Sequence, residues 1–442
     1  MVIWQQKKRE MQIKNFQNRE LSSDVAVKFR KTTLDNGLRI ITEEIPYSKS
    51  FALGISIHAG SRDESNEYCG AAHFLEHAAF RRTNKRTSRQ IASGFESIGA
   101  YSNAYTTKEV TCFYARALTP NFRKTFEILF DVVFNPAFNK SDIEKERTII
   151  LEEIKSYDDE PEELIFDYAD KLLYGSHPLS NPIVGTLDSV GKIDSEALLK
   201  FYKNHYTPGN IIITLAGNVS HDELTNEVIK VFGTKKTNGK QQLTDSSGQS
   251  SQEITPFKPQ RLEEVRSFQQ THILLANRVP GINSPDRYRL AVLNVMFGDG
   301  MSSRLNQKLR EQHGIAYSVY STLQLMSDCG GLYVYIATDK KKAAKAEKLL
   351  TAEFNKLLEQ KLIKPELQRS KEQLKSNSIM ALESLSVRMQ NLSKSEFVFG
   401  RQETIDSIIG SIDSVSMEHI EELIEKYMNL KNWHFVIFNP NK

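Results

Sequence analysis

The stretch AAHFLEHAAF, residues 71–80, carries two histidines four positions apart, with a glutamate directly before the second. Its alanines are strong helix formers, and positions i and i+4 share one face of an α-helix. His73 and His77 can therefore present both imidazoles to one metal ion, with Glu76 beside that face. The phenylalanine and leucine between the histidines indicate a partly buried helix, where polar side chains need partners.

These side chains are typical of a catalytic zinc site. Imidazoles and carboxylates are zinc ligands, and an open fourth position would hold a water whose pKa the metal lowers toward ~7. Glu76 would accept the proton of that water and later deliver it to a leaving amine. The alternative is a helix with surface histidines that bind nothing, because so short a motif also occurs by chance.

A catalytic zinc site needs a third protein ligand, and a helix predicted over residues 141–157 is the best source. Glu146 and Glu153 lie seven residues apart on this helix and share a face with apolar residues. Glu152 points about 100° away from Glu153 around the helix. Spacing alone leaves both Glu152 and Glu153 open as the third ligand. The helix is predicted to begin with a capping box, in which Ser141 is the N-cap and the glutamate three residues later completes it.

Size and composition narrow the class of protein. The chain has 442 residues, about twice the length of one compact domain. The net charge is +3, which gives no indication of a nucleic-acid-binding surface. Three cysteines match no metal or disulfide framework and are expected to be free thiols in a reducing compartment. No run approaches the ~18 apolar residues of a membrane span, and the N-terminus is too poor in apolar residues for a secretory signal. We therefore expect a cytoplasmic protein, with the mitochondrial matrix as the alternative.

The chain is predicted to form two similar domains. A polar segment rich in Ser, Gln and Gly, residues 234–257, is predicted to be a linker. On each side of it strands are predicted, from period-two alternation at residues 51–60, and helices follow them. The predicted fold class is α+β, with a mainly antiparallel sheet and helices on one face in each domain. The predicted boundaries are an N-terminal extension at 1–29 and domains at 30–233 and 258–442.

The order His-x-x-Glu-His is that of the inverted zincins. SNAYTTKE at residues 102–109, LEEI at 151–154 and YTPGNIIITLAGNV at 206–219 accompany it. With these motifs the chain resembles the pitrilysin-like, insulinase-type (M16) zinc metallopeptidases, and most closely the branch of the mitochondrial processing peptidase β-subunit and its bacterial relatives. The resemblance covers roughly residues 30–440. It implies an endopeptidase that cleaves extended or unfolded polypeptides and binds one Zn²⁺ per chain.

The resemblance also assigns residues near the reacting bond. It selects Glu153 over Glu152 as the third zinc ligand and gives Glu146 a supporting role beside the site. It implies that the second domain is a degenerate copy without metal ligands, which brings Arg310 and Tyr317 to the active site. There Tyr317 would stabilise the tetrahedral oxyanion and Arg310 the substrate backbone, since both side chains are donors suited to developing negative charge. Without the family, the arginine and the tyrosine would be an ordinary helix end and an ordinary strand residue.

Further substrate contacts are implied by the resemblance. Asn103 and Ala104 would lie on an edge strand that pairs with extended peptide backbone. Phe80 would line the pocket beyond the scissile bond, or alternatively belong to the core. Glu163 and Asp167 lie in an acidic run and would recognise a basic residue near the cut. Alternatively, such a run is a solvated helix start.

The resemblance has consequences for partners and for the alternative functions. Family members of this chain length work as pairs, which implies a homodimer or a heterodimer with an inactive paralogue. The main alternative is a non-catalytic partner or scaffold subunit of the same family, although such members tend to lose the ligand set that is intact here. A structural zinc site is a further alternative, but it would usually need a fourth protein ligand. Neither nucleic acid nor a membrane is an expected partner.

Overall fold

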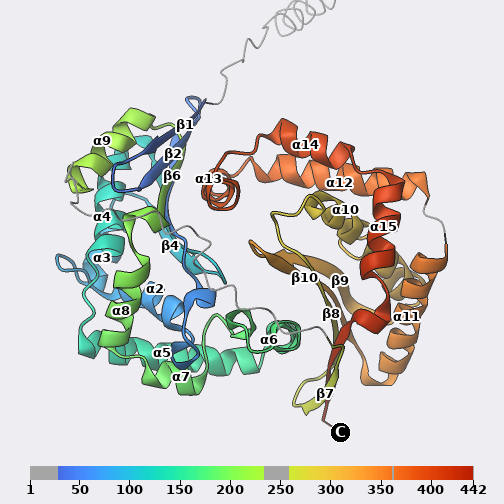
Figure 1. The fold of residues 1–442 in the computed structure, drawn as a ribbon. Helices are drawn as coiled ribbons and strands as arrows, with labels where there is room; N and C mark the ends of the chain where they lie inside the picture. Colours follow the sequence, from blue (N-terminus) through green and yellow to red (C-terminus); the bar gives the residue numbers. More distant parts are fainter. Residues whose placement is uncertain (1–27, 233–257, 361–362, 442) are drawn as a thin grey trace, which may run out of the picture.

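The structure is a computed structural model that describes residues 28–232, 258–360 and 363–441. The linker predicted at 234–257 and nearly all of the extension predicted at 1–29 lie outside these ranges. Two β-sheets lie in the two halves of the chain, and helices are layered on them (Figure 1). The α+β class expected from the sequence is confirmed.

The second sheet repeats the topology of the first. In chain order the strands are β1 (Lys28–Thr33), β2 (Arg39–Glu44), β3 (Ser50–Ile57), β4 (Tyr101–Thr106), β5 (Thr111–Leu118), β6 (Ile211–Gly217), β7 (Arg261–Arg266), β8 (Thr271–Pro280), β9 (Ala316–Leu325), β10 (Cys329–Thr338) and β11 (His434–Pro440). The sheet orders are β1-β2-β6-β3-β5-β4 and β7-β11-β8-β10-β9. Neighbours in the two sheets pair antiparallel except β2 with β6 and β11 with β7. The two parallel pairs occupy equivalent places in the two sheets. The prediction of two similar, mainly antiparallel sheets is therefore confirmed.

The α-helices fill the layers around the two sheets. They are α2 (Ala71–Arg81), α3 (Ser88–Glu96), α4 (Phe122–Phe134), α5 (Lys140–Asp158), α6 (Pro161–Tyr174), α7 (Leu187–Lys192), α8 (Ser195–His205), α9 (His221–Phe232), α10 (Arg287–Phe297), α11 (Ala343–Glu359), α12 (Lys364–Ala381), α13 (Leu385–Phe399), α14 (Ile405–Asp413) and α15 (Met417–Tyr427). Within the described ranges, no helix is both long and apolar enough to cross a membrane.

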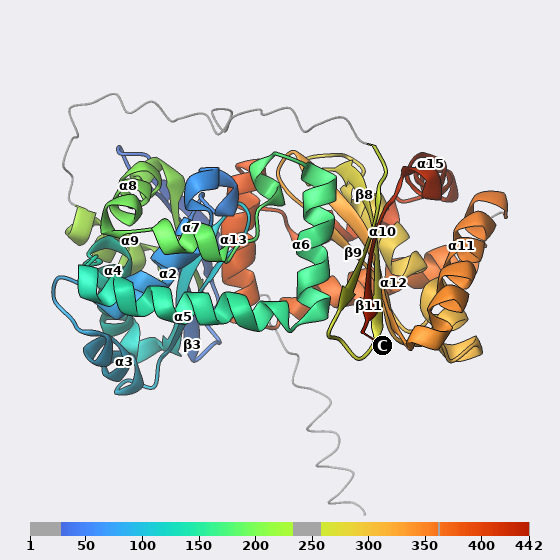
Figure 2. The same cartoon turned by 90° about the horizontal axis from the view of Figure 1, so that it is seen from below.

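The two halves exchange one helix each (Figures 1 and 2). On β3, Leu53 and Ile55 face the layer of α2 and α4, whereas the alternate residue Ala52 contacts Met389 of α13 from the second half. The side chains on that second face are small where α13 approaches: a Cβ on Gly54 would lie 2.1 Å from the sulfur of Met389. The opposite face of the first sheet is therefore covered by a helix from the other half.

Helix α6 makes the reciprocal crossing onto the second sheet. Its residues Ile165, Ala169 and Leu173 recur every four positions and form one apolar stripe. This stripe packs on Leu274 and Ala276 of β8, whose alternate residues face the main helix layer instead. The one-face arrangement expected from the sequence thus holds for the main helix layers, and an exchanged helix covers the other face of each sheet.

The capping box predicted at Ser141 is wrong. Helix α5 begins one residue earlier, at Lys140, and Asn139 is its N-cap without a side-chain cap hydrogen bond. Ser141 therefore already has helical backbone. Glu144 instead forms an ion pair with Arg147, and that guanidinium also donates to the carbonyl oxygen of Ile193 at 2.6 Å.

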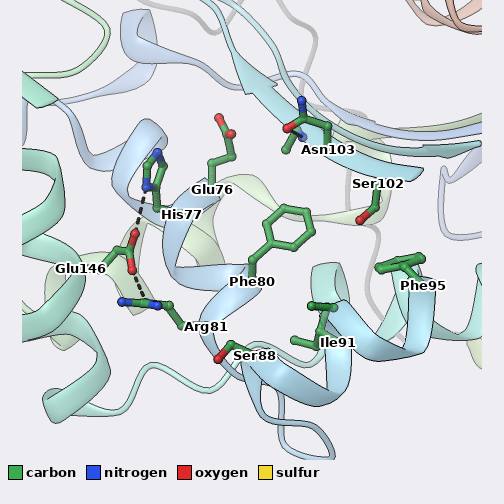
Figure 3. Close-up of a pocket in the computed structure, with 12 residues that line it drawn as sticks. Glu76, His77, Phe80, Arg81, Ser88, Ile91, Phe95, Ser102, Asn103 and Glu146 are labelled. Atoms are coloured by element: carbon green, nitrogen blue, oxygen red, sulfur yellow. Dashed lines mark hydrogen bonds and ion pairs between the residues drawn. The ribbon is translucent and has the colours of Figure 1, made fainter. Parts of the chain in front are cut away.

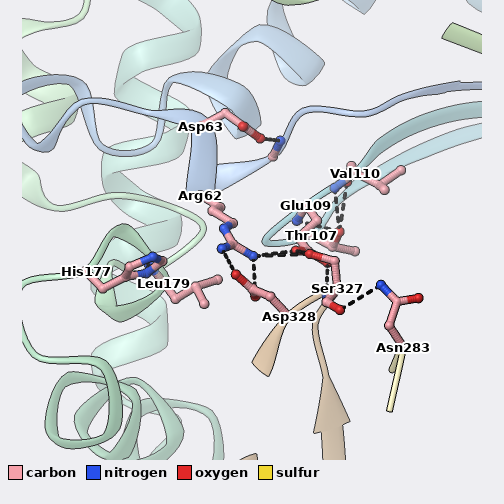
Figure 4. Close-up of polar contacts among 11 residues, drawn as sticks. Arg62, Asp63, Thr107, Glu109, Val110, His177, Leu179, Asn283, Ser327 and Asp328 are labelled. Atoms are coloured by element: carbon pink, nitrogen blue, oxygen red, sulfur yellow. Dashed lines mark hydrogen bonds and ion pairs between the residues drawn. The ribbon is translucent and has the colours of Figure 1, made fainter. Parts of the chain in front are cut away.

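A polar junction ties the first half to the second (Figure 4). The Arg62 guanidinium donates to both carboxylate oxygens of Asp328, at 2.8 and 2.5 Å, and to Glu109 at 2.7 Å. Glu109 accepts from the backbone N–H of Ser327 at 2.9 Å and from its hydroxyl at 2.6 Å. We call these four residues the Arg62 junction. It joins the 3-10 helix Ser61–Asp63 and the β4–β5 turn to the β9–β10 turn.

Replacing Arg62 by methionine is expected to destabilise the protein by about 2–4 kcal/mol. The Arg62 side chain is 6% exposed and that of Glu109 is 14% exposed, so the change leaves a largely buried carboxylate without its cation. The urea midpoint of unfolding measures the loss. Arg123→Met is the matched control, because Arg123 is 74% exposed in its ion pairs and should contribute less than about 1 kcal/mol. Equal shifts for the two variants would contradict the prediction.

Candidate active site

The N-terminus of helix α2 is fixed by a buried carboxylate. Glu64 accepts from the backbone N–H groups of Gly70 and Ala72, each at 2.7 Å. Burial raises the pKa of Glu64 to about 8, and the two backbone hydrogen bonds act in the opposite direction. Gly70 has a φ of +93°, and a Cβ there would lie 2.8 Å from the carbonyl oxygen of Val184. The start of the helix that carries both histidines therefore has little freedom to move.

Three side chains predicted as metal ligands lie together. The ligand atoms of His73, His77 and Glu153 are all within 4.8 Å of one another. The Nε2 atoms of the histidines lie 3.9 and 3.8 Å from the two carboxylate oxygens of Glu153. These distances are too long for hydrogen bonds and near the about 3.4 Å expected between two ligands of a tetrahedral zinc ion. The set fits a zinc ion in both chemistry and spacing.

Glu152, the alternative third ligand, lies on the exposed side of α5. The Glu152 side chain is 67% exposed and forms an ion pair with Lys155 at 2.6 Å. Its neighbour Glu153 is 32% exposed and faces the histidines of α2. The structure therefore places Glu153, and not Glu152, next to the two histidines.

Burial keeps His73 in the protonation state that a metal ligand needs. Desolvation and, secondarily, the charge of His77 lower the pKa of His73 to about 3. A neutral imidazole has a lone pair available for a metal. The Nδ1 atom of His73 is buried and has no hydrogen-bond partner among the described residues.

Glu146 makes a hydrogen bond to the second histidine (Figure 3). The Nδ1 atom of His77 donates to Glu146 at 2.9 Å, and Glu146 also forms an ion pair with Arg81. Burial lowers the pKa of His77, but the hydrogen bond to Glu146 and the nearby carboxylates raise it above its usual value. Partners of this kind hold a ligand's ring orientation. Engaging Nδ1 leaves Nε2 on the side of Glu153.

Glu76 lies beside the ligand set and makes a different contact. Its carboxylate accepts from the Thr106 hydroxyl at 2.5 Å. Burial raises the pKa of Glu76, while the hydrogen bond from Thr106 and the charge of His77 lower it. Its oxygens are not part of the ligand group formed by His73, His77 and Glu153.

A cavity of about 440 Å³ opens next to Glu76 (Figure 3). Its wall includes Phe80, Asn103 and Ala104 together with Glu76, His77 and Glu146. Phe80 also packs against the core, and its contact with substrate stays a prediction. The cavity wall also includes residues that the sequence analysis did not single out: Arg81, Ser88, Ile91, Ala92, Phe95 and Ser102. Ile91 and Phe95 are four positions apart on α3, and this apolar spacing in the sequence could have indicated that they share one face of a helix.

Comparison with known proteins identifies the family. Residues 39–187 match the family model of insulinase (peptidase family M16), and residues 192–374 match that of the peptidase M16 inactive domain. An uncharacterized zinc protease of Mycobacterium leprae is 35% identical over 93% of this chain and 91% of its own length. The uncharacterized zinc protease YmxG of Bacillus subtilis is 34% identical over 93% of this chain and 98% of its own length. The chain belongs to the M16 peptidase family.

Solved structures show the same fold for this M16 chain. A protease from Helicobacter pylori superimposes with a TM-score of 0.85 at 20% identity, over 94% of this chain and 100% of the other. A peptidase M16 inactive domain from Pseudomonas fluorescens gives a TM-score of 0.83 at 20% identity, over 94% and 99%. The two-domain architecture expected from the resemblance is thereby confirmed.

Two residues expected in an M16 active site are exposed side chains of the second half of the chain. Arg310 is exposed on the π-helix Asn306–Gln312, and Tyr317 of β9 is 61% exposed. In the described part of the chain, no hydrogen bond or ion pair links either side chain to Glu76 or to the three ligands. Their role in the site stays a prediction.

The two acidic residues expected to recognise basic substrates lie on α6. Glu163 is exposed and Asp167 is half-buried. Burial raises the pKa of Asp167 to about 6, and the charge of Lys108 opposes the shift. Neither residue lines the cavity beside Glu76, so their substrate role also stays a prediction.

Proposed function

We propose that this chain is a zinc-dependent endopeptidase that hydrolyses peptide bonds in extended or unfolded polypeptides. The observation that carries the proposal is the arrangement of His73, His77 and Glu153, with Glu76 beside them in the wall of a cavity. Relatives that cover nearly the whole chain are named zinc proteases, which supports it.

The three ligands would hold one zinc ion per chain. Zinc bound there would lower the pKa of its water toward ~7 and polarise the scissile carbonyl. Glu146 would keep the His77 ring in orientation through its hydrogen bond at 2.9 Å. The neutral state of His73 would favour metal binding at neutral pH.

Glu76 would act as the general base and then as the general acid. It would take a proton from the attacking water as the water oxygen bonds to the carbonyl carbon. It would then transfer that proton to the amine nitrogen as the C–N bond breaks. Its buried position, which raises its pKa, suits a group that both accepts and returns a proton.

The substrate would add as a strand to β4. This strand ends the first sheet and pairs only with β5 among the described strands. Asn103 and Ala104 would meet the peptide backbone there, and Phe80 would contact the side chain after the cut. Tyr317 would stabilise the oxyanion and Arg310 the substrate backbone once the second half closes over the substrate.

We also propose the substrate preference and the oligomeric state that the family resemblance implies. Glu163 and Asp167 would give a preference for a basic residue near the cut. The chain would work as a homodimer, or as a heterodimer with an inactive paralogue. The domain boundaries at 30–233 and 258–442 and the bacterial cytoplasmic location stay predictions.

A fluorogenic peptide assay with and without 1,10-phenanthroline tests the proposal. Cleavage is expected in the untreated protein, to be lost with the chelator and to return when zinc is added back. Zinc-loaded protein without cleavage would favour the alternative of a non-catalytic partner or scaffold subunit. Cleavage that the chelator does not affect would contradict a metal mechanism.

A further inference from the structure

Glu76 has one hydrogen-bond donor among the described residues, and it comes from the strand at the edge of the sheet. The Thr106 hydroxyl donates to Oε2 of Glu76 at 2.5 Å. The two residues are 30 positions apart in the sequence, and they lie on α2 and at the end of β4. A hydroxyl has a single proton, so this contact commits it to Glu76.

The backbone around Thr106 is held on both sides. Thr106 pairs with Thr111 at the end of the β4–β5 ladder. The next residue, Thr107, donates its N–H to the carbonyl of Val110 at 2.8 Å and accepts from the N–H of Ser61 at 3.1 Å. A β-branched side chain also has few χ1 rotamers. The direction in which the Thr106 hydroxyl points is therefore fixed by the fold.

The same strand would hold the substrate. Ala104 and Thr106 are two positions apart and so share one face of β4. Ala104 packs against the core on that face, and α2 lies beside β4. The carboxylate of Glu76 and a peptide paired with β4 would thus be positioned by one rigid segment.

We propose that Thr106 is a positioning residue for the general base: its hydroxyl fixes one oxygen of Glu76 and leaves the other to take the proton of the attacking water. The inference rests on the proposed function, because it assigns the orientation of the base in that reaction. Without the hydroxyl, the buried carboxylate could rotate away from the water. Loss of a correctly placed group lowers the rate of the chemical step more than the binding of substrate.

Three variants test the role of this hydroxyl with a fluorogenic peptide. Thr106→Val keeps the shape and removes the donor, and kcat is expected to fall about 10- to 100-fold with KM and bound zinc unchanged. Thr106→Ser restores the donor and should bring kcat to within about threefold of wild type. Thr111→Val is the matched control: Thr111 lies on the adjacent strand β5, and the change removes a buried hydroxyl that donates to the carbonyl of Ala59 at 2.9 Å. The control should lose stability but keep the wild-type kcat.

The outcomes separate this inference from the proposed function. A wild-type kcat in Thr106→Val, or a serine variant as slow as the valine variant, would overturn the positioning role alone. Equal losses in Thr106→Val and Thr111→Val would also overturn it, because they would show a general effect on folding. Absence of zinc-dependent cleavage in the wild type would overturn the proposed function and this inference together. If the valine variant does not fold, Thr106→Ala removes the same hydroxyl and carries the same test.

Discussion

Replacing Glu76 by glutamine is expected to lower kcat for peptide hydrolysis by two to four orders of magnitude. Glutamine has nearly the same shape, so it can still accept the hydrogen bond that Thr106 donates at 2.5 Å. Its amide cannot take a proton from water at neutral pH, and this is the loss that slows the reaction. The fluorogenic peptide assay measures the change.

Zinc content is the control for the Glu76 variant. The ligand group consists of His73, His77 and Glu153, and Glu76 is not among them. The glutamine variant is therefore expected to hold as much zinc as the wild type. Hydrolysis at the wild-type rate by purified variant would refute Glu76 as the base, and loss of zinc would show that it helps to hold the metal.

Replacing Glu153 by glutamine is expected to weaken zinc binding by more than about 100-fold and to abolish hydrolysis. Changing a residue that only supports a metal ligand typically lowers metal affinity 10- to 100-fold. Changing a ligand itself should lower the affinity at least as much. Glu153 lies 3.9 and 3.8 Å from the two histidines, and no other described acidic residue completes the group. Competition with a fluorescent zinc chelator measures the affinity.

The neighbouring glutamate provides the matched control for this experiment. Glu152→Gln makes the same chemical change one residue earlier on α5, at a side chain that is 67% exposed and paired with Lys155. It is expected to leave zinc affinity and kcat unchanged. The assignment of the third ligand would be reversed if the Glu152 variant lost zinc and the Glu153 variant kept it.

Much of the fold could be predicted from local patterns in the sequence. Period-two alternation predicted a strand at residues 51–60, where β3 (Ser50–Ile57) is observed, and the alanine-rich stretch around His73 is helix α2. The i, i+4 spacing also placed His73 and His77 on one face, because that relation depends only on helix geometry. Features that follow from the backbone period of a single element could therefore be predicted.

Features that depend on tertiary packing could not be read from local patterns. The stripe of Ile165, Ala169 and Leu173 shows that α6 needs an apolar partner, but nothing in it selects the second sheet over the first. The face of α5 that meets α2 decides between Glu152 and Glu153, and spacing along α5 does not contain that information. The start of α5 at Lys140 likewise departs from the capping pattern at Ser141. The hydrogen bond from Thr106 to Glu76 joins two elements, and no sequence motif predicts it.

Anomalous diffraction at the zinc absorption edge, from crystals of the zinc-loaded protein, tests the central claim most directly. One peak per chain is expected, within about 2.0–2.2 Å of a ring nitrogen of His73, a ring nitrogen of His77 and a carboxylate oxygen of Glu153. A zinc peak at another set of residues, or no peak in zinc-loaded protein, would contradict the account.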